Sequence, residues 1–383
     1  MTAAADDGRR RLRRAPHVLC LWEGTGRVVQ SARRPSGVPA TDLVLEVLDH
    51  LDTWTAIDTL AEALALPVAA LAVLVDGLHA HDLIETDAEG GPHTASSPGA
   101  RTGPWAAWSP AASLFHAATR DVAFGRGGAS GTDNAGPRPD PILPSLGASI
   151  LPLPAPCLEE QTLRAALRDR RTHRRFGPGP IALADLATLL GVTFGVQAWA
   201  QAAEGPLALK TSPSGGARHS LEAYVWARHV DGLAPGPYHY RPGDHTLSTI
   251  DQAVAPAAVT RWLPTQHGYE EAAVIVVLAS ELARVAWRYR SARAYRVILI
   301  EAGHLAQSFC LVATALGLAP FCTAAMAETA IETDLGLDGQ AQPAMYVMGV
   351  GQVASGPWQP HAGRPAPRLD VTALGRGLIG DET

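Results

Sequence analysis

The sequence contains few cysteines, and they lie far apart. Cys20, Cys157, Cys310 and Cys322 form no Cys-x-x-Cys pair. This spacing disfavours a disulfide framework or a zinc site and agrees with a reducing compartment. Long hydrophobic runs are also lacking, because no apolar stretch reaches the roughly 20 residues that a membrane span requires. These absences predict a cytoplasmic protein with no metal centre.

Lysine is almost absent as well. Lys210 is the single lysine among 31 basic residues, and the others are arginines. The formal net charge of −6 is small and says little about partners. A hydrophobic content of 47% and a charged content of 18% are typical of a soluble globular protein. The length of 383 residues is sufficient for two domains.

Basic residues are missing from one long stretch. None occurs between Arg34 and Arg101, where eleven acidic residues are found. Within it, residues 41–86 show the period of three short helices followed by a strand-like end. Before it, residues 16–34 are predicted to form a strand pair. This arrangement resembles a winged helix-turn-helix. Nucleic-acid affinity comes mostly from phosphate neutralisation, so we expect a peptide- or protein-docking module here, or a purely structural subdomain.

Composition divides the chain into four parts. Gly, Ser and Pro are enriched over 87–103 and 125–145, on either side of a predicted helix at 105–119. We therefore predict a disordered tail at 1–15, a winged-helix-like docking module at 16–95, a linker with a short helix and a mobile loop at 96–150, and a large domain at 151–383.

The first chemically informative segment is a cluster of arginines. Arg170, Arg171, Arg174 and Arg175 occupy four of six positions at the edge of a helical segment. Guanidinium groups bind phosphate through charge-assisted and often bidentate hydrogen bonds. The cluster therefore indicates a phosphate site, and a solvated basic surface is the alternative interpretation.

The second segment combines glycine with hydroxyl groups. Thr211-Ser212-Pro213-Ser214-Gly215-Gly216 precedes predicted strands at 221–227 and 232–240. Paired glycines allow the backbone to approach a flat ligand, and the hydroxyls can bond to its polar edge. An ordinary turn is the alternative.

Two further segments surround a long helix. Trp287-Arg288-Tyr289-Arg290 leads into a predicted helix at 298–316 that contains Gly303-His304 and Gln307. The helix ends at Gly317-Leu318, and a buried strand follows at 345–351. For His304 alone, a satisfied core histidine is the simpler interpretation.

Together these segments resemble the nitroreductase-like flavoprotein family. Residues 170–176 match its motif R-R-S-x-R-x-F, with Thr172 in the serine position. Pro213-Ser214 matches its P-S loop. The Gly303-His304 to Gln307 helix and the Gly317-Leu318 exit match its long central helix.

One branch of the family is more similar, namely the azoline dehydrogenases of the SagB/ThcOx type, which act with cyclodehydratases on thiazole- and oxazole-containing peptides. Its pattern G-L-x-P-G-x-Y-x-Y occurs at 232–240, and its Lys-Tyr pair reads Arg288-Tyr289 here. A winged-helix-like module also precedes its flavin domain. The resemblance covers about residues 16–383 and is strongest over 164–352.

The resemblance implies an α+β, nitroreductase-like fold: a central mixed or antiparallel sheet flanked by helices, dimeric, and preceded by the winged-helix-like module. It implies FMN as cofactor. Arg170, Arg171, Thr172 and Arg174 would hold the phosphate and ribityl chain, and Arg368 would close over the phosphate. The remaining cofactor contacts implied are Pro213, Ser214, Gly215, Gln307 and the backbone at Cys322, Thr323 and Ala324, which would face the flavin N5. Lys210 would approach the pyrimidine edge or lie on the surface.

The implied activity is oxidation of thiazolines or oxazolines in a precursor peptide, with oxygen as acceptor. Arginine, unlike lysine, cannot lose its proton near neutrality, so Tyr289 is the better general base and Arg288 its electrostatic support. The substitution is also consistent with different chemistry or with lost activity. Alternatives are an NAD(P)H-dependent reductase, a dehydrogenase for another peptide modification, and an inactive scaffold. Expected partners are a precursor peptide, a cyclodehydratase and a second copy of the chain, without nucleic acid or membrane.

Overall fold

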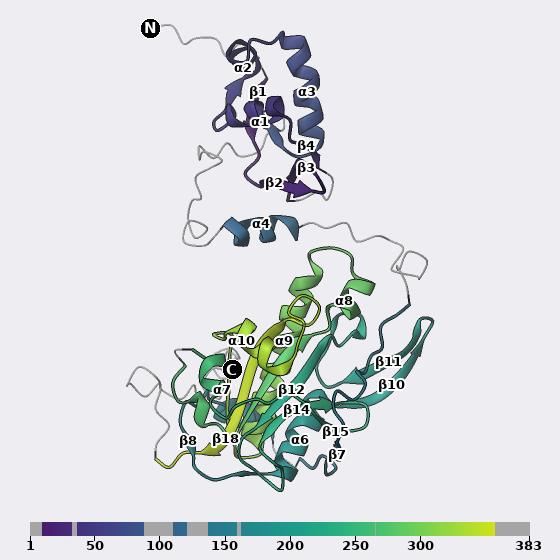
Figure 1. Cartoon of the computed structure of the whole chain (residues 1–383), viewed down its shortest axis with the longest axis vertical. Coiled ribbons are helices and arrows are strands. Elements are labelled where there is room, and N and C mark those ends of the chain that lie inside the picture. The colour runs from purple at the N-terminus through teal and green to yellow at the C-terminus, as the bar shows by residue number, and fades with distance from the viewer. Residues whose placement is uncertain are drawn as a thin grey trace, which may run out of the picture. The chain divides into compact units, whose positions relative to one another are not determined.

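The computed structural model describes residues 10–32, 37–87, 110–120, 137–158, 162–264 and 266–356. The chain forms two compact units, Met1–Phe124 with Ser291–Arg293, and Gly125–Arg290 with Ala294–Thr383 (Figure 1). Part of the expected linker belongs to the second unit. Its Ser145 hydroxyl lies 2.8 Å from that of Ser248, and the Arg138 guanidinium donates to the Glu204 carbonyl oxygen at 2.9 Å.

The first unit contains two small sheets and the three expected helices. One sheet has the order β5-β1-β6 and the other β2-β3-β4. The Thr41 hydroxyl caps the first helix by accepting from the Val44 amide at 3.3 Å. The elements are β1 (Arg11–Arg14), β2 (Val18–Glu23), β3 (Gly26–Ser31), β4 (Val38–Pro39), α1 (Asp42–Asp49), β5 (Thr55–Ala56), α2 (Ile57–Ala63), α3 (Val68–Ala80), β6 (Ile84–Thr86) and α4 (Pro110–Ala118). The strand pair expected over 16–34 is the β2–β3 hairpin; the winged-helix assignment stays a prediction.

The expectation of a disordered tail over residues 1–15 is wrong for Arg11–Arg14. These residues form β1, the central strand of the first sheet. Leu12 is fully buried, and Arg13 forms an ion pair of 2.6 Å with Glu85. The partners of this basic segment are acidic residues far along the chain, so its order is not evident from local sequence.

The second unit is organised by an eight-stranded sheet of order β17-β18-β16-β12-β14-β15-β7, with β8 paired to β18. All of its strand pairs are antiparallel. Its strands are β7 (Ile150–Pro152), β8 (Phe176–Gly177), β12 (Leu221–Ala227), β14 (Gly236–Arg241), β15 (Thr246–Thr249), β16 (Val274–Ser280), β17 (Ala319–Thr323) and β18 (Ala344–Val353). A separate hairpin joins β10 (Val196–Ala202) to β11 (Gly205–Lys210), and β9 (Ile181–Ala182) pairs in parallel with β13 (Val230–Asp231).

Helices cover both faces of this sheet, so every residue of β12 is buried. On one face Val225 packs with α6 (Leu183–Phe194) and α9 (Ala294–Ala315). On the other face Tyr224 packs with α7 (Ala258–Trp262) and α10 (Glu328–Leu335). The remaining helices are α5 (Leu163–Asp169), α8 (Leu282–Arg288) and the short 3₁₀ turns at Gly215–Ala217 and Tyr269–Glu271. The α+β architecture with an antiparallel sheet flanked by helices is therefore confirmed.

Helix α9 forms the centre of this unit. It has 22 residues and contains an 18-residue window with a mean hydropathy of 1.5, which by length and composition alone would suit a membrane span. Half of its apolar window is buried against the sheet and α6, as in the core helix of a globular domain. The helix contains no uninterrupted apolar stretch of this length, because Arg296 and Glu301 lie within it.

Candidate functional site

The predicted site segments converge on α9. The hydroxyl of Ser212 lies 2.8 Å from that of Ser308, and Nδ1 of His304 lies 3.3 Å from the carbonyl oxygen of Pro213. Two residues after Ser308, the buried Cys310 contacts Cys322 at the end of β17. His304 and Gln307 are exposed on the same helix. The glycine loop and the end of β17 therefore lie along neighbouring turns of α9.

The arginine segment lies beside the same strand. The amide of His173 donates to the carbonyl oxygen of Pro320 at 2.9 Å, which holds the segment against the start of β17. Arg170 and Thr172 are half-buried, whereas Arg174 is exposed. Arg170 is close enough to the two thiols to affect the pKa of both.

The other arginines of the motif point to different partners. The guanidinium of Arg171 donates to the carbonyl oxygens of Arg168 and Arg170, at 2.8 and 2.7 Å. Burial raises the pKa of Tyr269, and the nearby charge of Arg174 partly offsets this rise. Arg368 lies outside the described residues, so its predicted contact with the phosphate stays a prediction.

A thiol pair occupies the end of β17, where the backbone at Cys322, Thr323 and Ala324 was expected to face a flavin. A hydrogen bond from Cys310 lowers the pKa of the Cys322 thiol, and Tyr346 and Arg170 act in the same direction against the effect of burial. The same hydrogen bond and burial raise the pKa of Cys310. The strand then turns, because the Thr323 hydroxyl accepts from the Ala325 amide at 3.0 Å. Sequence spacing gave no sign of this pair.

The structure explains why glycine occupies positions 215 and 216, which the sequence did not reveal. A Cβ atom on Gly215 would lie 2.5 Å from Cγ1 of Val297, and one on Gly216 would lie 2.9 Å from the hydroxyl oxygen of Tyr289. Gly216 also has a positive φ of 61°, which favours glycine. Side chains of the protein itself therefore require both glycines.

The predicted catalytic pair lies at the end of α8. Tyr289 is half-buried, and its hydroxyl faces the Gly215–Gly216 turn. Arg288 forms an ion pair of 3.6 Å with Glu204 in the β10–β11 turn. The structure thus brings Tyr289 to the loop that contains Ser214, while Arg288 extends toward the hairpin.

Ser214 bonds to a buried carboxylate, Glu301, that was given no catalytic role. Its hydroxyl donates to a carboxylate oxygen of Glu301 at 2.6 Å and accepts from the His219 amide at 2.9 Å. Burial raises the pKa of Glu301, and the hydrogen bonds that its carboxylate accepts from the Ser214 hydroxyl and the Leu221 amide partly offset the rise. Burial lowers the pKa of Lys210, while Glu222 and Glu301 act against this effect. In the sequence, Glu301 could have been recognised as a candidate because it is the single carboxylate within an otherwise largely apolar helix.

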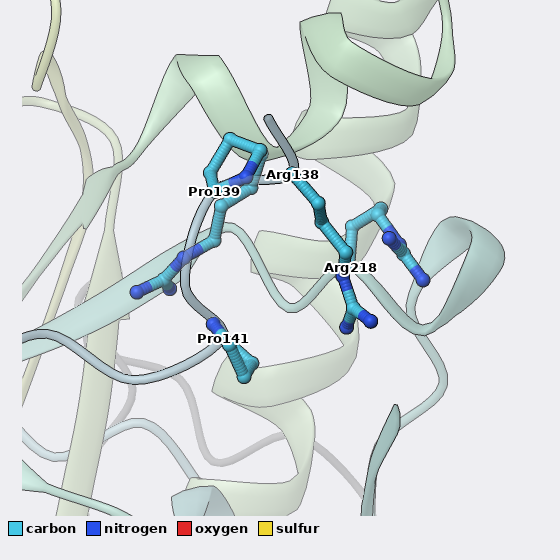
Figure 2. Close-up of a pocket in the computed structure, with 5 residues that line it drawn as sticks. Arg138, Pro139, Pro141 and Arg218 are labelled. Carbon is cyan, nitrogen blue, oxygen red and sulfur yellow. The ribbon is translucent and has the colours of Figure 1, made fainter. Parts of the chain in front are cut away.

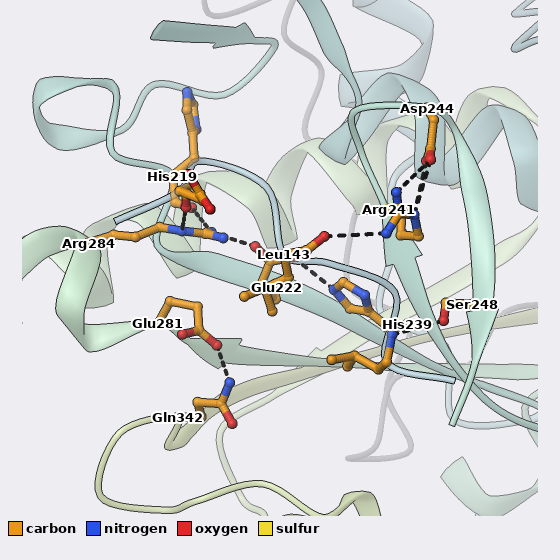
Figure 3. A network of polar contacts seen from close by, with 12 residues as sticks. Leu143, His219, Glu222, His239, Arg241, Asp244, Ser248, Glu281, Arg284 and Gln342 are labelled. Atoms are coloured by element: carbon orange, nitrogen blue, oxygen red, sulfur yellow. Dashed lines mark hydrogen bonds and ion pairs between the residues drawn. The ribbon is translucent and has the colours of Figure 1, made fainter. Parts of the chain in front are cut away.

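A fully buried ionic network is centred on Glu222 (Figure 3). Glu222 bonds to Nε2 of His239 at 2.9 Å and to the guanidinium of Arg284. Burial alone would raise the pKa of Glu222, but His239 and Arg284 lower it to about 2. Burial lowers the pKa of His219 to about 4, so this ring is neutral near pH 7. Its Nε2 lies 3.0 Å from the carbonyl oxygen of Ala208.

The described residues fit a phosphate-bearing planar cofactor. Arg170, Thr172 and Arg174 present two guanidinium groups and one hydroxyl within five positions, the donor set that suits a phosphate. Ser214 and the exposed amide of Gln307 add polar groups along α9. The cofactor-binding roles of these residues stay predictions.

Comparisons with known proteins place this unit among flavoprotein relatives. The model of the nitroreductase family matches residues 167–352. The nitroreductase MJ1384 of Methanocaldococcus jannaschii is 33% identical over 164 residues, which cover 43% of this chain and 78% of the relative. The trifolitoxin-processing protein TfxB of Rhizobium leguminosarum bv. trifolii is 32% identical over 145 residues, covering 36% of this chain and 38% of TfxB.

The similarity to solved structures is lower. A nitroreductase-type structure from Ralstonia eutropha has a TM-score of 0.45 at 20% identity, covering 58% of this chain and 99% of its own. A chain of the Escherichia coli microcin synthetase McbBCD complex with truncated pro-MccB17 has a TM-score of 0.41 at 19% identity, covering 67% of this chain and 85% of its own.

Proposed function

Because the chain belongs to the nitroreductase family, we propose that it is an FMN-dependent oxidoreductase that converts azoline rings of a ribosomally made peptide to azoles. FMN is the cofactor of this family. The relationship to TfxB, a trifolitoxin-processing protein, supports a role in peptide modification. The observation that carries the proposal is the convergence of the Arg170, Pro213 and Cys322 segments along α9.

In this proposal the chain holds the cofactor through groups from all three segments. Arg170, Thr172 and Arg174 would bind the phosphate, and Arg368 would complete that site. Pro213, Ser214, Gly215 and Gln307 would contact the ribityl and ring region, and the backbone of Cys322 to Ala324 would face the flavin N5. Bound FMN supplies the two-electron acceptor.

The protein itself manages the proton. The azoline loses a proton from Cα and a hydride from Cβ, which leaves a Cα=Cβ double bond and an aromatic ring. Tyr289 takes the Cα proton as the general base, and Arg288 is its electrostatic support. Glu301 accepts a hydrogen bond from Ser214 in the same loop, and the positive charge of Lys210 offsets the negative charge of Glu301. Oxygen then accepts the two electrons and two protons as hydrogen peroxide.

The first unit would recruit the substrate or a partner. A groove of about 300 Å³ is lined by residues of its β1, β2 and β3 strands and of α1, including Cys20, Val29 and Leu48. Its combination of apolar and ionic lining suits a peptide segment or a surface of a cyclodehydratase. We expect these events in the cytoplasm.

A second copy of the chain is part of the proposal. Tyr295, Leu299 and Ile300 of α9 are 42%, 46% and 57% exposed, an apolar face that a homodimer would cover. Light scattering should give twice the chain mass, and Ile300→Glu should reduce it to one chain mass.

The direct test combines colour with mass spectrometry. Purified protein should show flavin absorption near roughly 375 and 450 nm, as bound flavins do. With an azoline peptide and oxygen it should remove about two mass units, the two hydrogens of cofactor oxidation. Tyr289→Phe should lower turnover by about 100-fold with full flavin content, whereas Tyr238→Phe, whose hydroxyl donates to the Ala234 carbonyl at 2.8 Å, should not. An unchanged peptide mass with flavin-loaded protein refutes this substrate.

The similarity to a nitroreductase favours one alternative function, the NAD(P)H-dependent reduction of a small electrophile. Rapid anaerobic bleaching of the flavin by NADPH would support that function over the peptide oxidation. A colourless protein that takes up no FMN but binds a partner would instead support a scaffold.

A further inference from the structure

The hydroxyl of Ser214 has more hydrogen-bonding capacity than the fold uses. A serine hydroxyl has one proton to donate and two lone pairs that accept. The proton is donated to a carboxylate oxygen of Glu301 at 2.6 Å, and one lone pair accepts from the His219 amide at 2.9 Å. The second lone pair has no partner within the described ranges, and the residue is half-buried rather than enclosed. The one bond that Ser214 can still form is therefore as an acceptor.

Glu301 fixes this polarity, because both of its carboxylate oxygens accept hydrogen bonds. One oxygen accepts from the Ser214 hydroxyl, and the other accepts from the Leu221 amide at 3.4 Å. Glu301 belongs to α9 and is 2% exposed, so bulk water does not compete for the proton of Ser214. An ionised carboxylate has no proton to give, and Ser214 must remain the donor in the bond that joins them.

The turn that follows Ser214 is fixed from the side of Arg218. The Arg218 Nε donates to the Gly216 carbonyl oxygen at 2.8 Å. Arg218 also lines a small cavity together with Arg138, Pro139, Pro141 and Arg284 (Figure 2). The cavity has about 10 Å³ of space, which is room for about one water molecule. It therefore admits no organic ligand, and a ligand that bonds to Ser214 must reach it by another route.

We propose that Glu301 is a positioning residue for the cofactor: it holds the Ser214 hydroxyl as an acceptor, and Ser214 recognises an N–H or O–H donor of the flavin. The inference rests on the proposed FMN site, in which Ser214 would contact the ribityl and ring region. Oxidised FMN has donors of both kinds, the N3–H of the ring and the hydroxyls of the ribityl chain. A flavin carbonyl oxygen has no proton to give and would gain no bond from the free lone pair.

A proton on Glu301 would reverse the bond to Ser214. Burial raises the pKa of Glu301, and its hydrogen bonds partly offset the rise. The positive charges that also lower this pKa are those of Lys210 at the end of β11 and Arg284 in α8. A protonated carboxyl group donates to the Ser214 oxygen and fills the second lone pair, so the hydroxyl becomes a donor toward the ligand.

Glutamine at position 301 imitates the protonated acid at neutral pH. Its single carbonyl oxygen is needed by the Leu221 amide, so its NH₂ group faces Ser214 and donates to the hydroxyl oxygen. Both lone pairs of Ser214 are then used within the protein. A flavin donor would meet a second donor there, and affinity should fall.

A double-mutant cycle on the full-length protein tests this coupling, with FMN affinity measured by flavin fluorescence. Ser214→Ala should weaken FMN binding about fivefold, the worth of one neutral hydrogen bond, and Glu301→Gln should weaken it at least as much. Glu301→Gln in the Ser214→Ala background should cause no further loss, because Glu301 acts through the hydroxyl. Glu332→Gln, which alters a helical carboxylate that accepts from the Ala344 amide at 2.9 Å, is the matched control and should leave FMN affinity unchanged.

A pH profile distinguishes positioning from a structural role. Wild-type affinity should fall as the pH drops from about 8 to about 5 and Glu301 takes up a proton. Glu301→Gln and Ser214→Ala should both lack this component, whereas titration of the FMN phosphate is common to all three proteins. The cycle repeated with 3-methyl-FMN, which lacks the N3–H, identifies the donor: lost coupling assigns it to the ring, and retained coupling assigns it to the ribityl chain.

Two results would overturn the proposal and leave the FMN-dependent function intact. One is an equal loss of affinity from Glu301→Gln in both backgrounds, and the other is wild-type affinity and a wild-type pH profile in Ser214→Ala. A folded wild-type protein that binds no FMN would instead refute the proposed function together with this inference. Circular dichroism establishes that each variant is folded, and the Ser214→Ala profile decides the question if Glu301→Gln does not fold.

Discussion

Two groups of arginines in the same unit differ in how their charges are satisfied. Arg170 and Arg174 follow one another along a single segment and are half-buried or exposed. Arg218 and Arg284 come from distant segments, are almost fully buried, and lie within a network of carboxylates and carbonyl oxygens. An exposed cluster remains available to a large anion such as a phosphate, whereas a buried cluster is built into the fold and leaves room for about one water molecule. The following predictions test this difference.

The largest effect should come from the buried group. Glu222→Gln leaves Arg284 and His239 without their shared carboxylate in a site that is about 3% exposed. Breaking a buried ion pair by removing one partner typically costs about 3–5 kcal/mol. Urea unfolding should show this loss in the free energy of unfolding. Glu270→Gln, which removes only the contact of its carboxylate with the Gly268 amide, is the control; an equal loss there would refute a special role for the network.

Substitutions in the segment that contains Arg170 and Arg174 should lower ligand affinity and leave the free energy of unfolding nearly unchanged. Arg170→Gln removes a charge-assisted contact to the cofactor phosphate, which is worth about 1.5–3 kcal/mol, so FMN affinity should fall roughly 10- to 100-fold. Fluorescence titration of the flavin measures this change. Arg175→Gln, an exposed neighbour, serves as the control. Wild-type affinity in Arg170→Gln would exclude this segment as the phosphate site.

Acid should destabilise the buried group through two residues. His219 has a pKa of about 4 in the fold against its ordinary 6.5, so the unfolded chain takes up its proton first and stability falls as the pH drops from about 6.5 to 4. Glu222 has a pKa of about 2 against 4.5, so its contribution is complete above 4.5 and is lost as the pH falls toward 2. Thermal unfolding between pH 7 and 4 should therefore show a falling Tm. His219→Gln should flatten the upper part of this curve; a curve with the wild-type slope would contradict the assignment.

The smallest effect is expected in the Gly215–Gly216 turn. Gly216→Ala places a Cβ at positive φ and 2.9 Å from the Tyr289 hydroxyl, so we expect a loss of about 1–2 kcal/mol and a displaced Tyr289. Gly232→Ala is the matched control, because Gly232 has a φ of 78° and no atom within 4 Å of the added Cβ. Urea unfolding gives both values, and their difference isolates the contact with Tyr289. Identical losses would show that backbone strain alone requires glycine.

Local sequence patterns predicted the helices and strands better than they predicted the contacts within the candidate site. The period of residues 41–86 gave three helices, and the turn at 24–25 gave the β2–β3 hairpin, because both depend on neighbours within a few positions. The tail at Arg11–Arg14 was predicted wrongly because its order depends on acidic residues roughly forty to seventy positions away. The site motifs named the residues that line α9, but the sequence could not show that Glu301 bonds to Ser214 or that Cys310 meets Cys322.

The sequence by itself determined the segments that have chemical potential, since motif residues such as those at 170–174 and 213–216 are contiguous and their donors are inherent in the residue types. Only the tertiary structure decided which charges share a space. Arg138, Arg218 and Arg284 belong to no motif, and they line one cavity because the loop at 138–141, the glycine turn and α8 fold against one another. Burial then changes their energetics, because a charge removed from water depends on the few partners that the fold places beside it.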